Sequence, residues 1–310
     1  MLGSYYSTMD RPVVTVKQGK LQGVLQENVL DGSHYVAFKG IPFAAPPVGK
    51  LRFQDPKPPA AWDGIRDASE NGNVSLQKDL LTKTVIGDED CLYLNVYVPH
   101  SIYGTTRIPV MVWVHGGGNL HGSGSDINQK PDYLLAKEVI VVLITYRLGA
   151  LGFLKLSHET TSGNQGLKDQ IAALKWLREN IQVFGGDPEN ITVFGSSSGA
   201  ACVHLLMLSP LSKGAAHGDE ISHLFYTPQS VNDPQPPAIG TKDRKVVEAI
   251  TSMWTNFAKT GNPTSVIDQN VTTTWLPATA DALNYLEIND ALQCATITDY
   301  TNIFQEDSDD

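Results

Sequence analysis

A serine at position 197 is surrounded by the residue types that a hydrolytic nucleophile requires. The run GSSSG at 195–199 has the G-x-S-x-G form of a nucleophile elbow, in which a tight turn between a strand and a helix exposes the serine hydroxyl. In this motif the catalytic groups follow in the chain order serine, aspartate or glutamate, histidine. The candidate general base is His217, yet residues 198–216 contain neither aspartate nor glutamate. The sequence therefore offers a nucleophile and a base without the acid between them.

Three consecutive glycines provide a second part of the same chemistry. The run HGGG at 115–118 directly follows the apolar segment VMVWV at 110–114. Glycines let the backbone approach a substrate carbonyl closely, so that N–H groups can bind the oxygen as it becomes negative. We therefore predict an oxyanion hole whose donors are the N–H groups of Gly117, Gly118 and Ser198. The alternative for this run is a turn without a catalytic role.

Periodic apolar residues place both motifs at the ends of strands in an α/β fold. Runs rich in β-branched residues predict strands at 92–98, 110–115 and 139–146. The last two are nearly all apolar, as expected of strands covered on both faces of a sheet. Apolar spacings of three and four predict a helix over 164–184. A strand at 191–194 and a helix at 199–208 then flank the serine turn, in the order that the elbow requires.

The remaining elements are predicted from shorter patterns. Short strands are expected at 13–16 and 21–26, and the proline- and glycine-rich stretch 40–62 is expected to form an irregular surface loop. A final helix is expected at 243–259, with a Gly-Asn-Pro stop after it. Its expected buried side consists of Val246, Val247, Ile250, Trp254 and Phe257.

Composition limits the classes of function that the chain can have. Its 310 residues are 41% apolar, which suits a globular protein with a sizeable core, and its net charge of −10 disfavours a nucleic-acid surface. No stretch is long and apolar enough to span a membrane, and residues 1–16 lack the pattern of a secretory signal, so a cytoplasmic location is expected. The three cysteines, Cys91, Cys202 and Cys294, are too scattered for a zinc site or a disulfide framework. No cofactor or metal is implied.

Eight segments together resemble type-B carboxylesterases of the cholinesterase group, and their sequences are most similar to insect carboxylesterases. They are FKGIPFAAPPVGKLRF (38–53), EDCLYLNVYVP (89–99), VMVWVHGGG (110–118), YRLGALGF (146–153), GNQGLKDQIAALKWLRENI (163–181), FGGDP (184–188), HGDEISHLF (217–225) and WTNFAKTGNP (254–263). The resemblance covers residues 12–210 and 214–290, which correspond to the two ends of that family's sequence. The middle of the family's sequence is missing from this chain.

The resemblance implies an α/β-hydrolase fold with a mixed, mostly parallel central sheet flanked by helices. It implies one incomplete domain over 1–310 that is truncated internally after the nucleophile helix. The N-terminal part, 12–210, would carry the oxyanion loop and the elbow. The C-terminal part, 214–310, would carry the histidine loop and the terminal helix.

The resemblance also assigns catalytic roles. It places the nucleophile on Ser197 and the catalytic histidine on His217, and it places the triad acid in the missing segment, so the acid in this chain is unknown. Asp219 and Glu220 lie too close to His217 in sequence to orient its ring. Asn119 stands where the family usually has an aromatic residue, which leaves the substrate preference open.

Three functions remain open on this basis. The first is a carboxylic-ester hydrolase that acts on small-molecule esters and is weak or inactive because the acid is absent. The second is a protein that binds or sequesters ligands on the same scaffold without catalysis. The third is a truncated, inactive isoform of a carboxylesterase. If the missing strands would have paired beside 191–194, that segment becomes a sheet edge without charge or proline, and self-association is expected.

Overall fold

In the computed structural model, the described residues are 11–127, 129–156, 162–208, 236–279, 282–288 and 292–297. Contacts within the chain divide it into two compact units, residues 1–236 and 237–310. The division expected from the sequence, at 210–214, falls outside the described residues and stays a prediction.

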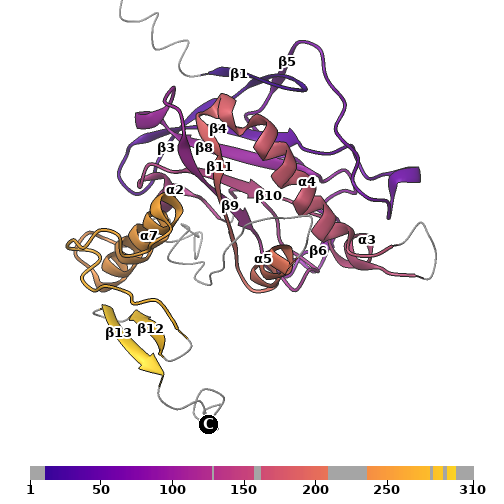
Figure 1. The fold of residues 1–310 in the computed structure, drawn as a ribbon. Coiled ribbons are helices and arrows are strands. Elements are labelled where there is room, and N and C mark those ends of the chain that lie inside the picture. The colour runs from indigo at the N-terminus through magenta and orange to yellow at the C-terminus, as the bar shows by residue number, and fades with distance from the viewer. Residues whose placement is uncertain are drawn as a thin grey trace, which may run out of the picture. The chain divides into compact units, whose positions relative to one another are not determined.

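The first unit consists of strands with helices between them (Figure 1). Its strands are β1 (Val13–Val16), β2 (Gly19–Gln22), β3 (Val24–Glu27), β4 (His34–Pro42), β5 (Ile65–Asp67), β6 (Gln77–Lys78), β7 (Val85–Ile86), β8 (Tyr93–Pro99), β9 (Ile108–Val114), β10 (Ile140–Ile144) and β11 (Gly186–Gly195). Its α-helices are α2 (Asp132–Leu135), α3 (Gly149–Phe153), α4 (Gln165–Asn180) and α5 (Ser198–Leu208). Short 3-10 helices lie at Gly49–Leu51, His100–Ile102 and Ile181–Phe184.

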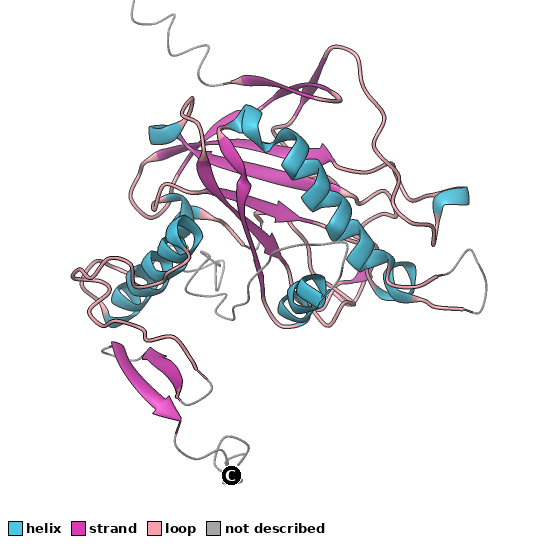
Figure 2. Cartoon of the chain, in the orientation of Figure 1, coloured by secondary structure: helices cyan, strands magenta, loops and turns pink. Residues whose placement is uncertain are grey.

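The central sheet has six described strands in the order β11-β9-β10-β8-β4-β3 (Figures 1 and 2). Strands β10, β9 and β11 run parallel, and Val114 at the end of β9 lies opposite both Ile144 of β10 and Gly195 of β11. All three strands therefore end at the same level, at the C-terminal end of the parallel part of the sheet. This alignment brings together the glycine run after Val114, the serine turn after Gly195 and the segment after Ile144.

The expected α/β architecture with a mixed sheet is confirmed, but the sheet is not mostly parallel in its described part. Strands β8, β4 and β3 pair antiparallel with their neighbours, so antiparallel pairs outnumber parallel ones. Parallel pairing requires a crossover, and helices cross between β9 and β10 and between β10 and β11. The parallel part of the described sheet is therefore confined to β10, β9 and β11.

The core lies on both faces of the central sheet. Alternate residues of β8, β9 and β10 share one buried apolar cluster with Trp176 and Leu177 of α4. The residues between them, such as Met111 and Trp113, point to the opposite face and are also buried. The prediction that these apolar strands are covered on both faces is confirmed.

Two predicted boundaries change in the structure. The helix expected over 164–184 ends as α4 at Asn180 and continues as a 3-10 turn to Phe184, after which Gly185 has a left-handed φ of +92°. Residues 40–42 were expected in a loop but belong to β4, because the strand resumes pairing with β8 after an irregularity between Phe38 and Ile41. The irregular segment therefore begins at Phe43.

The second unit contains α7 (Lys242–Thr260) and a hairpin of β12 (Leu283–Ile288) and β13 (Leu292–Ile297). The helix is capped by Thr241, whose hydroxyl accepts a hydrogen bond from the Arg244 N–H, and by Gly261 in a left-handed conformation. On the expected buried side, Val247 and Ile250 are buried. The other three residues of that side, Val246, Trp254 and Phe257, are half-buried. The hairpin had no counterpart among the predicted elements.

Candidate active site

Ser197 occupies a sharp turn between β11 and α5. Its φ is +52°, a left-handed conformation that costs a residue with a side chain roughly 1 kcal/mol or more. The turn is closed by hydrogen bonds from the Gly199 N–H to the Ser196 carbonyl at 2.8 Å and from the Ala201 N–H to the Ser197 carbonyl at 3.0 Å. Ser197 is exposed, whereas Ser196 is 5% exposed. This is the geometry by which an elbow presents a hydroxyl at the end of a strand.

The glycines around the turn allow the elbow and the glycine run to meet backbone to backbone. A Cβ atom on Gly116 would lie 2.6 Å from the Ser196 carbonyl oxygen, and one on Gly195 would lie 2.7 Å from the Val114 carbonyl oxygen. A Cβ on Gly199 would collide with the same Val114 oxygen. Any side chain at these three positions would therefore separate the two segments.

Three main-chain amides lie around this contact, at Gly117, Gly118 and Ser198. Gly117 and Gly118 have φ values of +113° and +61°, conformations that glycine adopts readily. Ser198 is the first residue of α5, where helical N–H groups have no partner within the helix. Within the described residues, none of the three N–H groups has a hydrogen-bond acceptor. The arrangement can therefore offer donors to an oxygen that becomes negative beside Ser197.

His115 precedes the glycines but does not have the environment of a general base. Its ring is 1% exposed, stacks on Tyr146 at 4.4 Å between centroids, and has its Nδ1 atom 2.9 Å from the Gly116 carbonyl oxygen. Burial lowers the pKa of His115 to about 4. Because that carbonyl can only accept, Nδ1 carries the proton, and the ring is neutral at pH 7.

The buried His115 should make stability depend on pH. The folded pKa of His115, about 4, lies below the ordinary 6.5. Its neutral ring therefore costs no stability above pH 6.5, but as the pH falls toward 4 the unfolded state binds the proton first and the free energy of unfolding decreases. The full shift corresponds to about 3 kcal/mol. We expect urea titrations from pH 7 to 4 to show a steeper loss of unfolding free energy in the wild type than in His115→Asn. Equal slopes for the two proteins would contradict this assignment.

The predicted base, His217, lies outside the described residues, as do Asp219 and Glu220. The structure thus brings together Ser197 and the three amides predicted from sequence. It leaves the placement of the base as a prediction.

Two buried thiols are poor competitors of Ser197 as nucleophiles. Burial raises the pKa of Cys91 to about 12, and burial also raises the pKa of Cys202. A thiol attacks as its thiolate, so neither group is reactive at neutral pH. The described cysteines, including Cys294, are all free.

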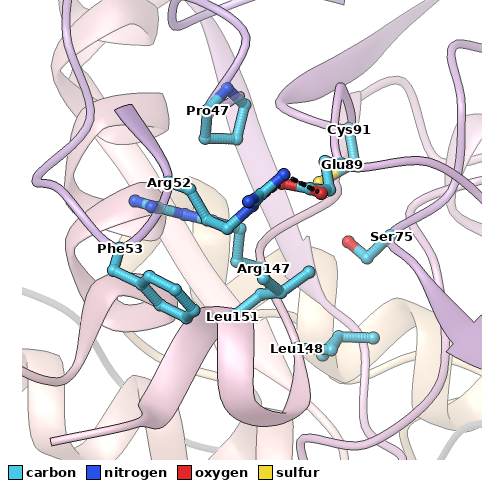
Figure 3. A pocket seen from close by; sticks show the side chains of 9 residues that line it. All are labelled: Pro47, Arg52, Phe53, Ser75, Glu89, Cys91, Arg147, Leu148 and Leu151. Carbon is cyan, nitrogen blue, oxygen red and sulfur yellow. Dashed lines mark hydrogen bonds and ion pairs between the residues drawn. The ribbon is translucent and has the colours of Figure 1, made fainter. Parts of the chain in front are cut away.

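Cys91 lines a small pocket of about 10 Å³ (Figure 3). Arg52 and Glu89 also line this pocket, and the Arg52 guanidinium donates from Nε and Nη2 to the two carboxylate oxygens of Glu89 at 2.6 and 2.7 Å. This volume accommodates about one water molecule and no ester. A larger hollow of about 370 Å³ lies between residues 55–59 and α4, and its lining includes no residue of the elbow or the glycine run.

The sequence patterns did not predict Gln77 and Tyr146, which bind the backbone on either side of the three glycines. Gln77 binds the backbone of Gly122 through both ends of its amide, accepting from the N–H at 2.7 Å and donating to the carbonyl at 2.8 Å. Tyr146 donates to the His115 carbonyl at 2.7 Å. No local pattern predicts either contact, because each depends on how distant segments align at the edge of the sheet.

Comparison with known proteins decides the family. The model of the carboxylesterase family matches residues 10–218 and 212–304. The chain belongs to the carboxylesterase family. The two matched parts overlap at 212–218, the junction where the middle of the family's sequence was expected to be missing.

Individual relatives agree with this membership. Juvenile hormone esterase from Tribolium castaneum is 37% identical over 299 residues, which cover 94% of this chain and 49% of that protein. Para-nitrobenzyl esterase from Bacillus subtilis is 46% identical over 214 residues, which cover 66% of this chain and 42% of that protein. The chain therefore spans half or less of the length of these relatives.

The fold of the chain is that of an α/β-hydrolase, as expected from the sequence. The crystal structure of juvenile hormone esterase from Manduca sexta, with OTFP covalently attached, matches with a TM-score of 0.62 at 37% identity. The match covers 66% of this chain and 40% of that one. In the described residues, no helix is long and apolar enough to cross a membrane, and no group of three or more His, Cys, Asp or Glu side chains could hold a metal ion.

Proposed function

We propose that the chain has the chemistry of a serine carboxylic-ester hydrolase and that this form turns esters over weakly or not at all. The observation that carries the proposal is the position of Ser197, exposed in a left-handed turn beside three amides that lack acceptors in the described residues. Such a turn is strained, and strain of this kind concentrates at functional sites.

The proposed reaction forms and then hydrolyses an acyl-enzyme. Ser197 Oγ attacks the ester carbonyl carbon while His217 takes the hydroxyl proton, and the carbonyl oxygen becomes an oxyanion. The N–H groups of Gly117, Gly118 and Ser198 stabilise that oxyanion. His217 then protonates the leaving alcohol, which departs and leaves the acyl-enzyme. In the second half, His217 takes a proton from water as the water attacks the acyl carbon, and it returns that proton to Ser197 Oγ as the carboxylic acid leaves.

The expected weakness follows from the missing acid. In a complete triad the acid holds the imidazole in the correct tautomer and stabilises its charged form, and its loss lowers turnover by roughly four orders of magnitude. Residues 198–216 contain no aspartate or glutamate. The nucleophile and the oxyanion donors remain, so the same covalent chemistry is retained at a strongly reduced rate.

Two assays on the full chain test this proposal together. We expect a fluorophosphonate probe to label the protein once per chain, and we expect a short-chain nitrophenyl ester to be hydrolysed about 10⁴-fold more slowly than by a complete triad. Rapid steady turnover would overturn the proposed weakness. Absence of any label would overturn the proposed nucleophile.

The substrates proposed are small carboxylic esters. The names of the relatives, juvenile hormone esterase and para-nitrobenzyl esterase, support this class without selecting a member of it. A non-catalytic role in binding such esters, or an inactive isoform, is the alternative favoured by the missing acid and by the two-part family match. Ester binding by calorimetry without any labelling would favour the binding role.

Self-association through a sheet edge is a further part of the proposal. Among the described strands, β11 stands at the end of the central sheet; its first half carries Asp187, Pro188 and Glu189, but its segment ITVF at 191–194 carries neither charge nor proline. An apolar edge segment invites pairing with another chain. We expect size-exclusion chromatography with light scattering to show dimers or larger species, and we expect Thr192→Lys, but not Thr192→Ser, to shift them toward monomer. A monodisperse wild-type monomer would contradict this.

A further inference from the structure

The three amides of the candidate oxyanion hole come from two different segments of the chain. Gly117 and Gly118 belong to the loop after β9, and Ser198 begins α5 after β11. Donors stabilise a developing charge only when they are fixed in position before the reaction. Glycine has no side chain and the least restricted backbone, so other residues must hold this loop against the elbow.

A hydrogen bond to the hydroxyl of Ser198 joins the two segments. The Asn119 N–H donates to Ser198 Oγ at 3.1 Å. At the other end of the glycine run, Tyr146 donates to the His115 carbonyl oxygen at 2.7 Å.

Two separate bonds hold the two ends of the glycine run. Tyr146 has one hydroxyl proton, and the 2.7 Å bond to the His115 carbonyl uses it, because its approach to Asn119 Oδ1 is longer, at 3.4 Å. Tyr146 therefore holds the residue before the glycines, and Ser198 Oγ holds the residue after them by accepting from the Asn119 N–H.

The bonds fix both ends of the glycine run. His115 comes immediately before the three glycines and is held by Tyr146, and Asn119 comes immediately after them and is tied to the elbow by Ser198. Two further contacts hold Asn119 from other sides: its carbonyl accepts from the Gly149 N–H at 2.7 Å, and its Oδ1 accepts from the Cys202 thiol at 3.6 Å. Asn119 itself has a φ of +58°, a conformation that asparagine tolerates better than most residues.

We propose that the hydroxyl of Ser198 is a positioning group that clasps the glycine run to the elbow, a role separate from that of its backbone N–H. We name the set of His115, Asn119, Tyr146 and Ser198 the glycine clasp. Its catalytic consequence rests on the proposed function, because a clasp matters for chemistry only if the amides bind an oxyanion. Its structural consequence, a rigid glycine run, does not.

Hydrogen exchange on the full chain tests the structural part. In Ser198→Ala the Asn119 N–H loses its acceptor, so we expect peptides that cover 116–120 to exchange about 10-fold faster than in the wild type. Ser196→Ala is the matched control, because it removes a neighbouring hydroxyl that takes no part in the clasp, and it should exchange like the wild type in these peptides. Equal exchange in Ser198→Ala and Ser196→Ala would overturn the clasp.

Labelling kinetics test the catalytic part. We expect Ser198→Ala to lower the maximal rate of phosphonylation about 10-fold with little change in the concentration of probe that gives half that rate, and Ser198→Thr, which keeps a hydroxyl, to recover most of it. A loss confined to probe affinity would contradict a positioning role. If the wild type takes no label, the proposed function fails, whereas the exchange comparison still decides the clasp.

A second variant guards against a folding defect in the first. Tyr146→Phe removes the bond to the His115 carbonyl while leaving the ring stacked, and it should loosen the same peptides. If these peptides loosen in Tyr146→Phe but not in Ser198→Ala, the Ser198 hydroxyl does not hold the glycine run and the proposal is overturned.

Discussion

Replacing Ser197 with alanine should reduce fluorophosphonate labelling from one adduct per chain to none. Ser197 is the exposed residue of a strained turn beside three amides. The thiols of Cys91 and Cys202 are buried and have raised pKa values, so they cannot replace it. Intact-protein mass spectrometry measures the result directly. We expect no adduct mass in this variant under conditions that label the wild type fully.

Ser196→Ala is the control for that experiment. It changes the neighbouring serine of the same elbow, which is 5% exposed, and it should retain the label. Persistent labelling of Ser197→Ala would mean that another residue is the nucleophile. Loss of labelling in both variants would mean that the turn itself had been disrupted.

Replacing Asp169 with alanine should lower the free energy of unfolding by about 3–5 kcal/mol. Asp169 and Arg147 are 0% and 3% exposed, and Asp169 accepts from the Arg147 side chain at 2.6 and 2.8 Å and from its backbone N–H at 3.1 Å. Removing the carboxylate leaves a buried guanidinium whose charge is uncompensated. Denaturant titration at pH 7 measures the change.

A paired replacement distinguishes the cost of an orphaned charge from the loss of packing. The double variant Asp169→Leu with Arg147→Met replaces both ions with apolar groups and should be more stable than Asp169→Leu alone, because no buried charge is left unpaired. A double variant less stable than that single variant would show that the cost lies in packing or in the bond from Arg147 to the Gln54 carbonyl. This pair matters for the site because Arg147 directly follows Tyr146 of the glycine clasp.

The parts of the site that consist of short local motifs, the glycine run and the serine turn, could be predicted from the sequence. The glycine run and the serine turn each follow an apolar strand, and parallel strands that end in register bring such motifs together. The pairing of Val114 with Gly195 places them side by side, as the elbow motif requires. The same local logic predicted α4 and α7 to within a few residues.

Features that depend on distant contacts could not be predicted. The role of the Ser198 hydroxyl depends on Asn119, 79 residues earlier, being brought to the elbow by the pairing of β9 with β11. The antiparallel majority among the described strand pairs depends on which distant strands become neighbours, which no local pattern specifies. The β12–β13 hairpin lies in a stretch whose residues alternate too weakly to indicate strands.

The central claim is that Ser197 faces an oxyanion hole made of main-chain amides, and a crystal structure of the phosphonylated protein tests it most directly. The phosphonyl group is tetrahedral and carries an oxygen where the oxyanion of an ester would form. We predict that this oxygen lies about 2.7–3.1 Å from the N–H nitrogens of Gly117, Gly118 and Ser198. An adduct on Ser197 whose oxygen points to solvent, with all three amides beyond hydrogen-bonding distance, would contradict the account.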